Sequence, residues 1–409
     1  MIRIAIMGIG GYGQMLDKAI EAASRELDCQ LVAAADSRVH DLPDRVANLR
    51  DRGVEIFEDS LAMLDAVGDR CDAVFICTSI QSHAPLTIAA FERGLHVHVE
   101  KPPAATVQEV DQMLSAAEKA GRMCFVGFHN IHEPSTQLLK ERIVSGRLGR
   151  IRTLVSRAGW PRDRAYYTRN NWAGTLRDGD AWVLDGPANN ALAHQVNNML
   201  YAASDRPAAY ATPVAVRGEL YAAGPIASHD AAAIAIHTAE GPVAHWIGSH
   251  CSEALFGPIV EIEASGGRAT WRPGRGVLIE YADGNREEAE AGDPRPAMVV
   301  NFLKAIRDGV PDSMRCSLTH ARAFVLALNG AHESSGRIHR ISSEYTHTEG
   351  EGGQRRTIID GFDATVNEAA DRGCLFSDLP DAPPWAVRTE PFDLTGYARF
   401  PQRFDTDGD

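Results

Sequence analysis

The sequence predicts an α/β protein, because strand and helix patterns alternate through its first 125 residues. A β-rich run at Ile2–Met7 leads into the glycine loop Gly8-Ile9-Gly10-Gly11-Tyr12-Gly13, and a helical pattern then extends to about Arg25. Strands that alternate with helices predict a doubly wound parallel sheet, the Rossmann arrangement. From about residue 210 to 290 successive strands with turn signals predict a second α/β domain with a large, mostly antiparallel open sheet.

Short apolar runs and one periodic segment supply the remaining elements of the first domain. Strands are predicted at Leu31–Ala35, Ala73–Cys77, Leu95–Val99 and Met123–Gly127, with helices from about His83 and at Thr106–Ala120. The last of these helices carries apolar residues at Val107, Val110 and Met113, which is the spacing of one helical face.

The second domain is predicted to begin near residue 127. Its expected elements are helices at 134–145 and 187–203, a strand at 151–158, strands between 210 and 290, and late helices near 296–308 and 317–335. We therefore expect a dinucleotide-binding domain at 1–126, a substrate and oligomerisation domain at 127–344, and an irregular C-terminal extension at 345–409 that is rich in Asp, Arg and Pro.

The composition is that of an ordinary globular protein. The chain has 409 residues, of which 44% are hydrophobic, and a formal net charge of −14. This charge argues against a nucleic-acid or anionic-membrane partner, and no apolar run reaches the length of a membrane span. The seven cysteines form no Cys-x-x-Cys pair, and the strand pattern starts at Ile2, so no signal peptide is expected. These features predict reduced thiols in a cytoplasmic protein.

The glycine loop is the strongest functional signal. It follows a strand and precedes a helix, which is the context that dinucleotide binding requires. The glycines allow a tight turn and a close approach of the backbone to a pyrophosphate, whose charge the helix amino terminus stabilises. The predicted cofactor contacts in the loop are Gly8, Gly10, Gly11, Tyr12 and Gly13.

Asp36 and Arg38 bear on the choice of cofactor. Asp36 closes the second strand, a little over twenty residues beyond Gly13. A carboxylate there accepts both ribose hydroxyls of NAD and repels the 2′-phosphate of NADP, whereas Arg38 is able to pair with that phosphate. We expect NAD, with NADP as the alternative.

Glu100-Lys101-Pro102 follows the strand at Leu95–Val99. A lysine at the carboxyl end of a parallel strand stands where open α/β sheets bind their ligands. Beside a nicotinamide, Lys101 would hydrogen-bond a substrate hydroxyl and stabilise developing negative charge on its oxygen. The alternative is an ordinary surface lysine.

These motifs resemble those of the glucose–fructose oxidoreductase/inositol dehydrogenase family, the Gfo/Idh/MocA group. The resemblance rests on the glycine loop, Asp36, Glu100-Lys101-Pro102 and the segment 138–151, and more loosely on the segment 301–336. It implies a Rossmann domain, an α/β domain with a large open sheet, and NAD(P)-dependent oxidation or reduction of sugars and polyols, usually by oligomers.

The resemblance also implies further cofactor contacts, at Thr78, Ser79, His83, Glu100 and Lys101. Ser79 and Ile80 stand where the family often has Pro and Asn. Ile131 stands near the place where the family often has an arginine.

His194 matches the family's catalytic histidine, which a helix carries four residues after an aspartate. Here that aspartate is replaced by Asn190, and a later one by Asn197. A carboxylate beside a histidine raises its pKa, so the amides favour a neutral imidazole, which still acts as a base. The hypothesis is that His194 takes the hydroxyl proton while Lys101 positions the oxygen; the alternative for His194 is a buried structural histidine.

The segment 157–172 combines aromatic and basic residues just before His194. Trp160, Tyr166 and Trp172 are suited to stack on a sugar, and Arg162 or Arg169 to pair with a carboxylate. Together with Asn190 they form the predicted substrate-binding set. The alternatives are a subunit contact and a solvated loop.

Four histidines of the second half, His229, His237, His245 and His250, are nearly evenly spaced. They lie in strand-like segments without a compact ligand pair, so no metal site is predicted.

The resulting functional prediction is an NAD(P)-dependent dehydrogenase. It would transfer a hydride between nicotinamide C4 and a hydroxyl carbon of a sugar, polyol or sugar acid. Two alternatives stay open: an NAD-dependent glycosidase with transient oxidation, and a non-catalytic NAD-binding regulatory protein. A homo-oligomer, dimer or tetramer, is expected through the sheet of the C-terminal domain.

Overall fold

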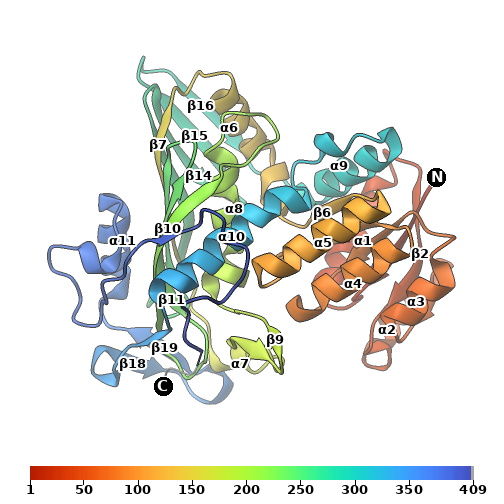
Figure 1. Ribbon diagram of the computed structural model, residues 1–409, viewed down its shortest axis with the longest axis horizontal. Helices are drawn as coiled ribbons and strands as arrows, with labels where there is room; N and C mark the ends of the chain where they lie inside the picture. The colour runs from red at the N-terminus through yellow and green to blue at the C-terminus, as the bar shows by residue number, and fades with distance from the viewer. Residues whose placement is uncertain (407–409) are drawn as a thin grey trace. The chain divides into compact units, whose positions relative to one another are not determined.

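Parallel strands form the sheet of the N-terminal part of the molecule (Figure 1). A computed structural model describes residues 1–406, and within them the chain forms two compact units. Unit 1 comprises Met1–Ala104, Gln108–Glu133 and Asp293–Arg322; unit 2 comprises Ala105–Val107, Pro134–Gly292 and the described chain from Ala323.

The sheet of unit 1 is doubly wound, as the sequence predicts. Its strands are β1 (Ile2–Met7), β2 (Cys29–Ala35), β3 (Glu55–Phe57), β4 (Ala73–Ile76), β5 (His96–Val99) and β6 (Cys124–Val126). They pair in parallel in the order β3-β2-β1-β4-β5-β6. The order reverses beside β1, and sheets of this kind bind ligands at the carboxyl ends of the strands there.

Helices connect these strands. They are α1 (Tyr12–Ala23), α2 (Pro43–Asp51), α3 (Ser60–Val67), α4 (Ile80–Glu92) and α5 (Val107–Ala120). A further helix, α9 (Pro294–Asp308), comes from much later in the chain. The short elements α2, α3 and β3 lack a long hydrophobic period, and the sequence patterns did not predict them.

Helix α9 belongs to unit 1, although the sequence placed residues 296–308 in the second domain. The reason is an aromatic cluster. The ring of Phe302 lies 5.8 Å from that of Phe75 and 5.6 Å from that of Phe125, between centroids, and all three side chains are fully buried. This long-range packing brings a distant helix back to the parallel sheet.

Unit 2 contains the large sheet, which is mostly antiparallel, as predicted. Its strands are β7 (Ile151–Gly159), β10 (Pro213–Ala222), β11 (Ala231–Thr238), β12 (Val243–Ser249), β13 (Phe256–Ala264), β14 (Gly267–Arg272), β15 (Gly276–Tyr281), β16 (Arg286–Glu290), β17 (His339–Arg340) and β20 (Phe392–Asp393). The order is β16-β15-β14-β13-β7-β12-β11-β10-β17, with β20 paired to β10. The pairs β12–β7 and β10–β17 are parallel.

The remaining helices and short strands surround the large sheet. The helices are α6 (Pro134–Val144), α7 (Arg164–Tyr167), α8 (Ala193–Ala202), α10 (Leu318–Ser335) and α11 (Phe362–Arg372). The short strands are β8 (Arg177–Asp178), β9 (Ala181–Trp182), β18 (Thr346–Glu349) and β19 (Arg356–Ile359). Both α8 and α11 contact β7 and β12, and they lie on opposite faces of the sheet (Figure 1).

The strand sequences reflect how many faces of the sheet are covered. Strand β11, AAAIAIHT, is buried at every position except His237, because protein covers both of its faces. Strand β16, by contrast, alternates exposed and half-buried residues, which is typical of a sheet with one face in water.

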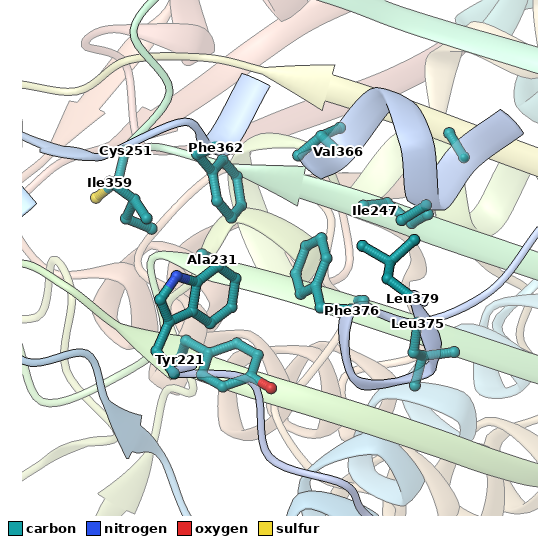
Figure 2. Close-up of a cluster of buried hydrophobic side chains, with 14 of the residues drawn as sticks. Tyr221, Ala231, Ile247, Cys251, Ile359, Phe362, Val366, Leu375, Phe376 and Leu379 are labelled. Atoms are coloured by element: carbon teal, nitrogen blue, oxygen red, sulfur yellow. The ribbon is translucent and has the colours of Figure 1, made fainter. Parts of the chain in front are cut away.

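The structure corrects the prediction that residues from 345 onward are irregular. The C-terminal extension, meaning residues 345–406, forms the β18–β19 pair and helix α11. Phe362 and Phe376 pack with Tyr221 and Ala231 of the sheet (Figure 2). Trp385 belongs to the same cluster. Between ring centroids, Trp385 lies 5.1 Å from Tyr221 and 5.5 Å from Phe376. The extension is thus part of the core of unit 2.

Two buried carboxylates accept hydrogen bonds from this extension. Glu219 on β10 is fully buried and accepts hydrogen bonds from Ser377 Oγ (2.6 Å) and the Tyr221 hydroxyl (3.0 Å). Glu333 on α10 accepts the Tyr397 hydroxyl (2.6 Å) and three backbone N–H groups, those of residues 402–404. Hydrogen bonds to charged groups of this kind are the strong ones.

None of the helices within residues 1–406 combines the length and apolar character that crossing a membrane would need.

The aromatic cluster of the extension can be tested with Phe376→Ala. We expect the variant to lose about 3–5 kcal/mol of stability, the usual cost of removing a fully buried phenylalanine ring. Its melting temperature should fall, and trypsin should cut within residues 345–406 sooner than in the wild type. Leu255→Ala is the control, because Leu255 is 74% exposed. Equal proteolysis of both variants would contradict the packing role.

Candidate active site

The glycine loop between β1 and α1 is built so tightly that its first and last glycines tolerate no side chain. Gly8 has φ +84°, and a Cβ there would stand 2.1 Å from the carbonyl oxygen of Cys77. A Cβ on Gly13 would stand 2.0 Å from the carbonyl oxygen of Gly8. At Gly11, the residue before α1, a Cβ would meet nothing within 4 Å. The loop therefore presents open backbone before a helix amino terminus, which fits a pyrophosphate group.

Asp36 is held against this loop. Its Oδ2 accepts the backbone N–H of Ile9 at 3.0 Å and its Oδ1 accepts that of Arg38 at 2.9 Å. The carboxylate is 8% exposed, and each oxygen keeps lone pairs for further donors, such as ribose hydroxyls. The Arg38 guanidinium lies 3.9 Å from Oδ1, with its side chain 70% exposed.

His83 links two backbone segments at the same edge of the sheet. Its ring nitrogens lie 2.8 Å from the carbonyl oxygen of Pro102 and 3.1 Å from that of Thr78. Burial lowers the pKa of His83 to about 4, so the ring is neutral near pH 7 and its single N–H donates to only one of the two carbonyl oxygens. Thr78 Oγ1 accepts the Ser82 hydroxyl at 2.7 Å, and the Ser79 and Ser82 hydroxyls lie 3.4 Å apart. Direct cofactor contacts of Thr78, Ser79 and His83 stay predictions.

Glu100 and Lys101 follow β5. The Lys101 N–H donates to Glu100 Oε2 at 3.3 Å, and the bond from Lys101 to Pro102 is cis. Glu100 is 5% exposed and lies directly on Gly127, where a Cβ would approach Oε1 to 2.3 Å. Burial raises the pKa of Glu100 to about 7, against the lowering effect of the charges on Lys101 and Arg295. A weakly acidic carboxyl thus stands beside the candidate catalytic lysine.

Two residues that the sequence patterns did not predict, His129 and Arg295, lie beside Tyr12. The Tyr12 hydroxyl lies 3.0 Å from Nδ1 of His129, and the Arg295 guanidinium lies 5.8 Å from the centre of the Tyr12 ring. Burial, followed by the charges of Arg295 and Lys101, lowers the pKa of His129 to about 3. Among the described residues, the buried Nε of Arg295 has no hydrogen-bond partner. Arg295 comes from α9, so no local motif could have predicted it.

His194 lies on α8, but the predicted continuous helix 187–203 is wrong. Pro187–Ala191 forms a wide π-turn in which the Leu192 N–H donates to the Pro187 carbonyl at 2.7 Å, and α8 begins only at Ala193. The interruption places Asn190 on a separate turn, so the spacing of four residues does not by itself put it on the face of His194. The His194 side chain is 9% exposed.

A carboxylate stands beside Asn190 after all. The Asn190 amide donates to Asp185 Oδ1 at 2.8 Å, and the Gly174 N–H donates to Oδ2 at 2.7 Å. Asp185 is 2% exposed. It precedes the π-turn, outside the helical spacing that pointed to Asn190, so the sequence pattern did not predict it. Asn197 is fully buried, and its amide donates to the Tyr210 hydroxyl at 3.3 Å.

Lys140 on α6 stabilises the carboxyl end of α8. Its Nζ donates to the carbonyl oxygens of Tyr201 (2.5 Å), Ser204 (2.7 Å) and Ala209 (3.3 Å). Burial lowers the pKa of Lys140 to about 7, yet three carbonyl acceptors require the three N–H donors that only the ammonium form has. Lys140 therefore caps the helix that carries His194.

The predicted substrate-binding residues gather in unit 2. The guanidinium carbon of Arg169 lies 3.7 Å from the centre of the Tyr166 ring and 5.3 Å from that of Trp172. That of Arg162 lies 4.8 Å from the Tyr166 ring and 5.3 Å from the Trp160 ring. Arg169 is also 4.0 Å from Asp185, the partner of Asn190. The predicted aromatic and basic set thus joins Asn190 in one cluster.

The two candidate catalytic residues belong to different units, Lys101 to unit 1 and His194 to unit 2. Within residues 1–406 no group of three or more His, Cys, Asp or Glu side chains is arranged to hold a metal ion.

Similarity to known proteins is strongest in the N-terminal part of the chain. Residues 2–128 match the family model described as the oxidoreductase family with an NAD-binding Rossmann fold, GFO_IDH_MocA. The chain is 35% identical to D-glucoside 3-dehydrogenase of Escherichia coli over 160 residues, which are 38% of this chain and 43% of that protein. It is 28% identical to myo-inositol 2-dehydrogenase of Thermotoga maritima over 151 residues, 36% of this chain and 42% of that protein. The aligned part thus spans about two fifths of each relative.

Solved structures resemble nearly the whole fold. The WlbA dehydrogenase of Bordetella pertussis, solved in complex with NADH and UDP-GlcNAcA, matches with a TM-score of 0.66 and 21% identity over 82% of this chain and 96% of that one. An oxidoreductase of Agrobacterium radiobacter, solved with NAD+, L-tartaric acid and magnesium, matches with a TM-score of 0.67 and 15% identity over 82% and 96%. In its N-terminal part, residues 2–128, the chain is thus similar to the Gfo/Idh/MocA family of oxidoreductases.

Proposed function

We propose that this protein is an NAD-dependent dehydrogenase acting on a hydroxyl carbon of a sugar, polyol or sugar acid. One observation carries the proposal: the tight glycine loop, the carboxylate of Asp36 and Lys101 all stand at the carboxyl edge of one parallel sheet. The names of the relatives, D-glucoside 3-dehydrogenase and myo-inositol 2-dehydrogenase, support carbohydrates as the substrate class.

The residues that would hold NAD follow from the geometry of unit 1. The backbone N–H groups at the start of α1 would bind the pyrophosphate, and Asp36 would accept the ribose hydroxyls. Thr78, Ser79 and His83 would line the same edge. When bound, the nicotinamide ring supplies the hydride acceptor or donor at its C4 atom.

Lys101 and His194 would divide the work on the substrate hydroxyl. The Lys101 ammonium would hold the oxygen and stabilise its developing negative charge. The His194 imidazole would accept the hydroxyl proton in oxidation and return it in reduction. Asn190, oriented by Asp185, would bind a neighbouring hydroxyl. Asp185 thus supplies a carboxylate next to Asn190, which stands in place of the family's aspartate, and this favours an enzyme over a non-catalytic regulatory protein.

We also propose a cytoplasmic homo-oligomer. The cytoplasm is supported by the seven cysteines, all of which lie within the described range and are free. The chain's own extension covers one face of the sheet over β11 and β12. An interface through the sheet would therefore use the strands β14–β16, whose outer residues are exposed or half-buried.

The function can be tested by following NADH absorbance against a panel of sugars, polyols, inositols and uronates. Lys101→Met and His194→Ala should each lower kcat by about 10²–10⁴-fold, the usual contribution of a positioned acid–base group. The dissociation constant of NAD should change less than threefold. The control is Lys119→Met, since Lys119 is exposed. Wild-type turnover in both site variants would refute the assignment.

Cofactor choice can be tested with Asp36→Asn, which removes the negative charge but keeps an oxygen for the Ile9 N–H. We expect the KM for NAD to rise about tenfold, equivalent to about 1.4 kcal/mol, and the KM for NADP to fall. Arg38→Ala should weaken any NADP activity that remains. An unchanged ratio of the two KM values in Asp36→Asn would show that Asp36 does not contact the ribose.

The raised pKa of Glu100 predicts a pH-dependent stability. In the unfolded chain Glu100 ionises near pH 4.5, whereas in the folded protein its pKa is about 7. Its stabilising contribution is complete below pH 4.5 and is lost as the pH rises through 7, at up to about 1.4 kcal/mol per pKa unit.

Glu100→Gln carries no charge, so between pH 5 and pH 8 its melting temperature should fall less than that of the wild type. Glu118→Gln, at an exposed position, should follow the wild type. Parallel curves for Glu100→Gln and the wild type would mean that Glu100 ionises normally.

A further inference from the structure

Arg162 and Arg169 both lie against the ring of Tyr166, at 4.8 and 3.7 Å from its centre. Within residues 1–406 Arg162 forms no ion pair, and its buried Nε has no hydrogen-bond partner. The acidic group nearest to Arg169, Asp185, is 4.0 Å away and already accepts Asn190 and Gly174. The cluster therefore has more positive charge than the surrounding carboxylates balance.

His250 adds a neutral polar atom to this cluster. Its side chain is 2% exposed, Nδ1 lies 3.1 Å from the Tyr167 hydroxyl, and Nε2 has no hydrogen-bond partner among the described residues. Its ring centre lies 5.5 Å from that of Tyr166. Burial, followed by the charges of Arg162 and Arg169, lowers the pKa of His250, so the ring is neutral near pH 7.

The backbone around these side chains is held from two sides. The Arg162 N–H donates to the His250 carbonyl at 3.0 Å, which ties the cluster to the end of β12. The Arg164 N–H donates to the Arg355 carbonyl at 2.8 Å, and Asp163 pairs with Arg356 in a β-bridge. The C-terminal extension therefore supports the short helix α7, on which Tyr166 stands.

The charge of this region is opposite to that of the molecule. The chain has a formal net charge of −14. The cluster and the strand that supports it nevertheless carry five arginines, Arg162, Arg164, Arg169, Arg355 and Arg356, against three carboxylates, those of Asp163, Asp185 and Glu349, of which Glu349 pairs with Arg356 at 2.7 Å. A local positive region in an acidic protein attracts anions and raises their encounter rate. Guanidinium groups are the side chains best suited to carboxylate and phosphate, because their N–H donors match pairs of oxygens.

We propose that Arg162, Arg169 and His250 Nε2 form a subsite for an anionic group of the substrate, a carboxylate or a phosphate. The proposal rests on the dehydrogenase function proposed above and narrows its substrates to acidic carbohydrates. Tyr166 holds both guanidinium groups in place. Asp185 connects Arg169 to Asn190, so that the anion stands in the same cluster as the residue expected to bind a hydroxyl.

Kinetics on matched substrates test the subsite. D-glucose, D-glucuronate and D-glucose 6-phosphate differ only at C6, which is neutral, a carboxylate and a phosphate, respectively. We expect the wild type to show at least tenfold higher kcat/KM for one of the two anions than for glucose, and the better anion identifies the preferred group. Arg162→Gln and Arg169→Gln should each raise its KM at least tenfold with little change in kcat. Their effect on glucose should be much smaller.

Arg272→Gln is the control, because Arg272 is an exposed arginine at the end of β14 in the same unit. It should behave as the wild type. The KM for the anion should also rise with added sodium chloride, since salt screens the guanidinium charges. Equal KM changes for glucose and the anions in the site variants, or no change in either, would overturn the proposal.

Binding separates failure of the subsite from failure of the proposed function. NADH-saturated protein would be titrated calorimetrically with the same three compounds. If the protein oxidises none of the compounds but binds an anion, and Arg169→Gln lowers the affinity for that anion tenfold, the subsite stands and the dehydrogenase function fails. Turnover of neutral sugars without anion preference would leave the function standing and remove the subsite. If the protein neither binds an anion nor turns over any of the three compounds, both the subsite and the dehydrogenase function are refuted.

Discussion

Parallel pairing of β1 with both β2 and β4 is the constraint on which the rest of unit 1 depends. It directs the carboxyl ends of these strands to one edge, where the glycine loop, Asp36 and the segment from Thr78 to His83 follow them directly. The loop crosses β4 so closely that the Cys77 carbonyl occupies the space of a Gly8 side chain. The sheet itself therefore positions the site, and the glycine at position 8 is a consequence of this close approach.

Local patterns predicted the elements whose stabilisation is local. The helices with a long apolar period, the strands of unit 1 other than β3, and the antiparallel sheet all follow from hydrophobic spacing and turn residues. In the candidate site, the residues adjacent to these elements were predictable too, such as Asp36 at a strand end. The cluster of Arg162, Tyr166 and Arg169 could be proposed from composition, although only the structure supplies its geometry.

What escaped prediction depends on contacts between distant parts of the chain. Arg295 approaches Tyr12 because α9 packs through Phe302 onto the parallel sheet. Asp185 reaches Asn190 because a π-turn replaces a regular helical turn. One signal was available for the C-terminal extension: β11 is apolar at nearly every position, which is typical of a strand covered on both faces. Such a strand needs a segment that covers its second face, and residues beyond 345 were the part of the sequence without another assigned role.

The fully buried Glu219 has a consequence for biosynthesis. Its carboxylate lies in the sheet, and its strongest partner, Ser377, is 158 residues further along the chain. While a nascent chain lacks that partner, an ionised group and the apolar face around Tyr221 both stay in contact with water. The second unit therefore reaches its final packing only after Ser377 has left the ribosome, and a chain that stops before this residue would expose a surface prone to chaperone binding or aggregation.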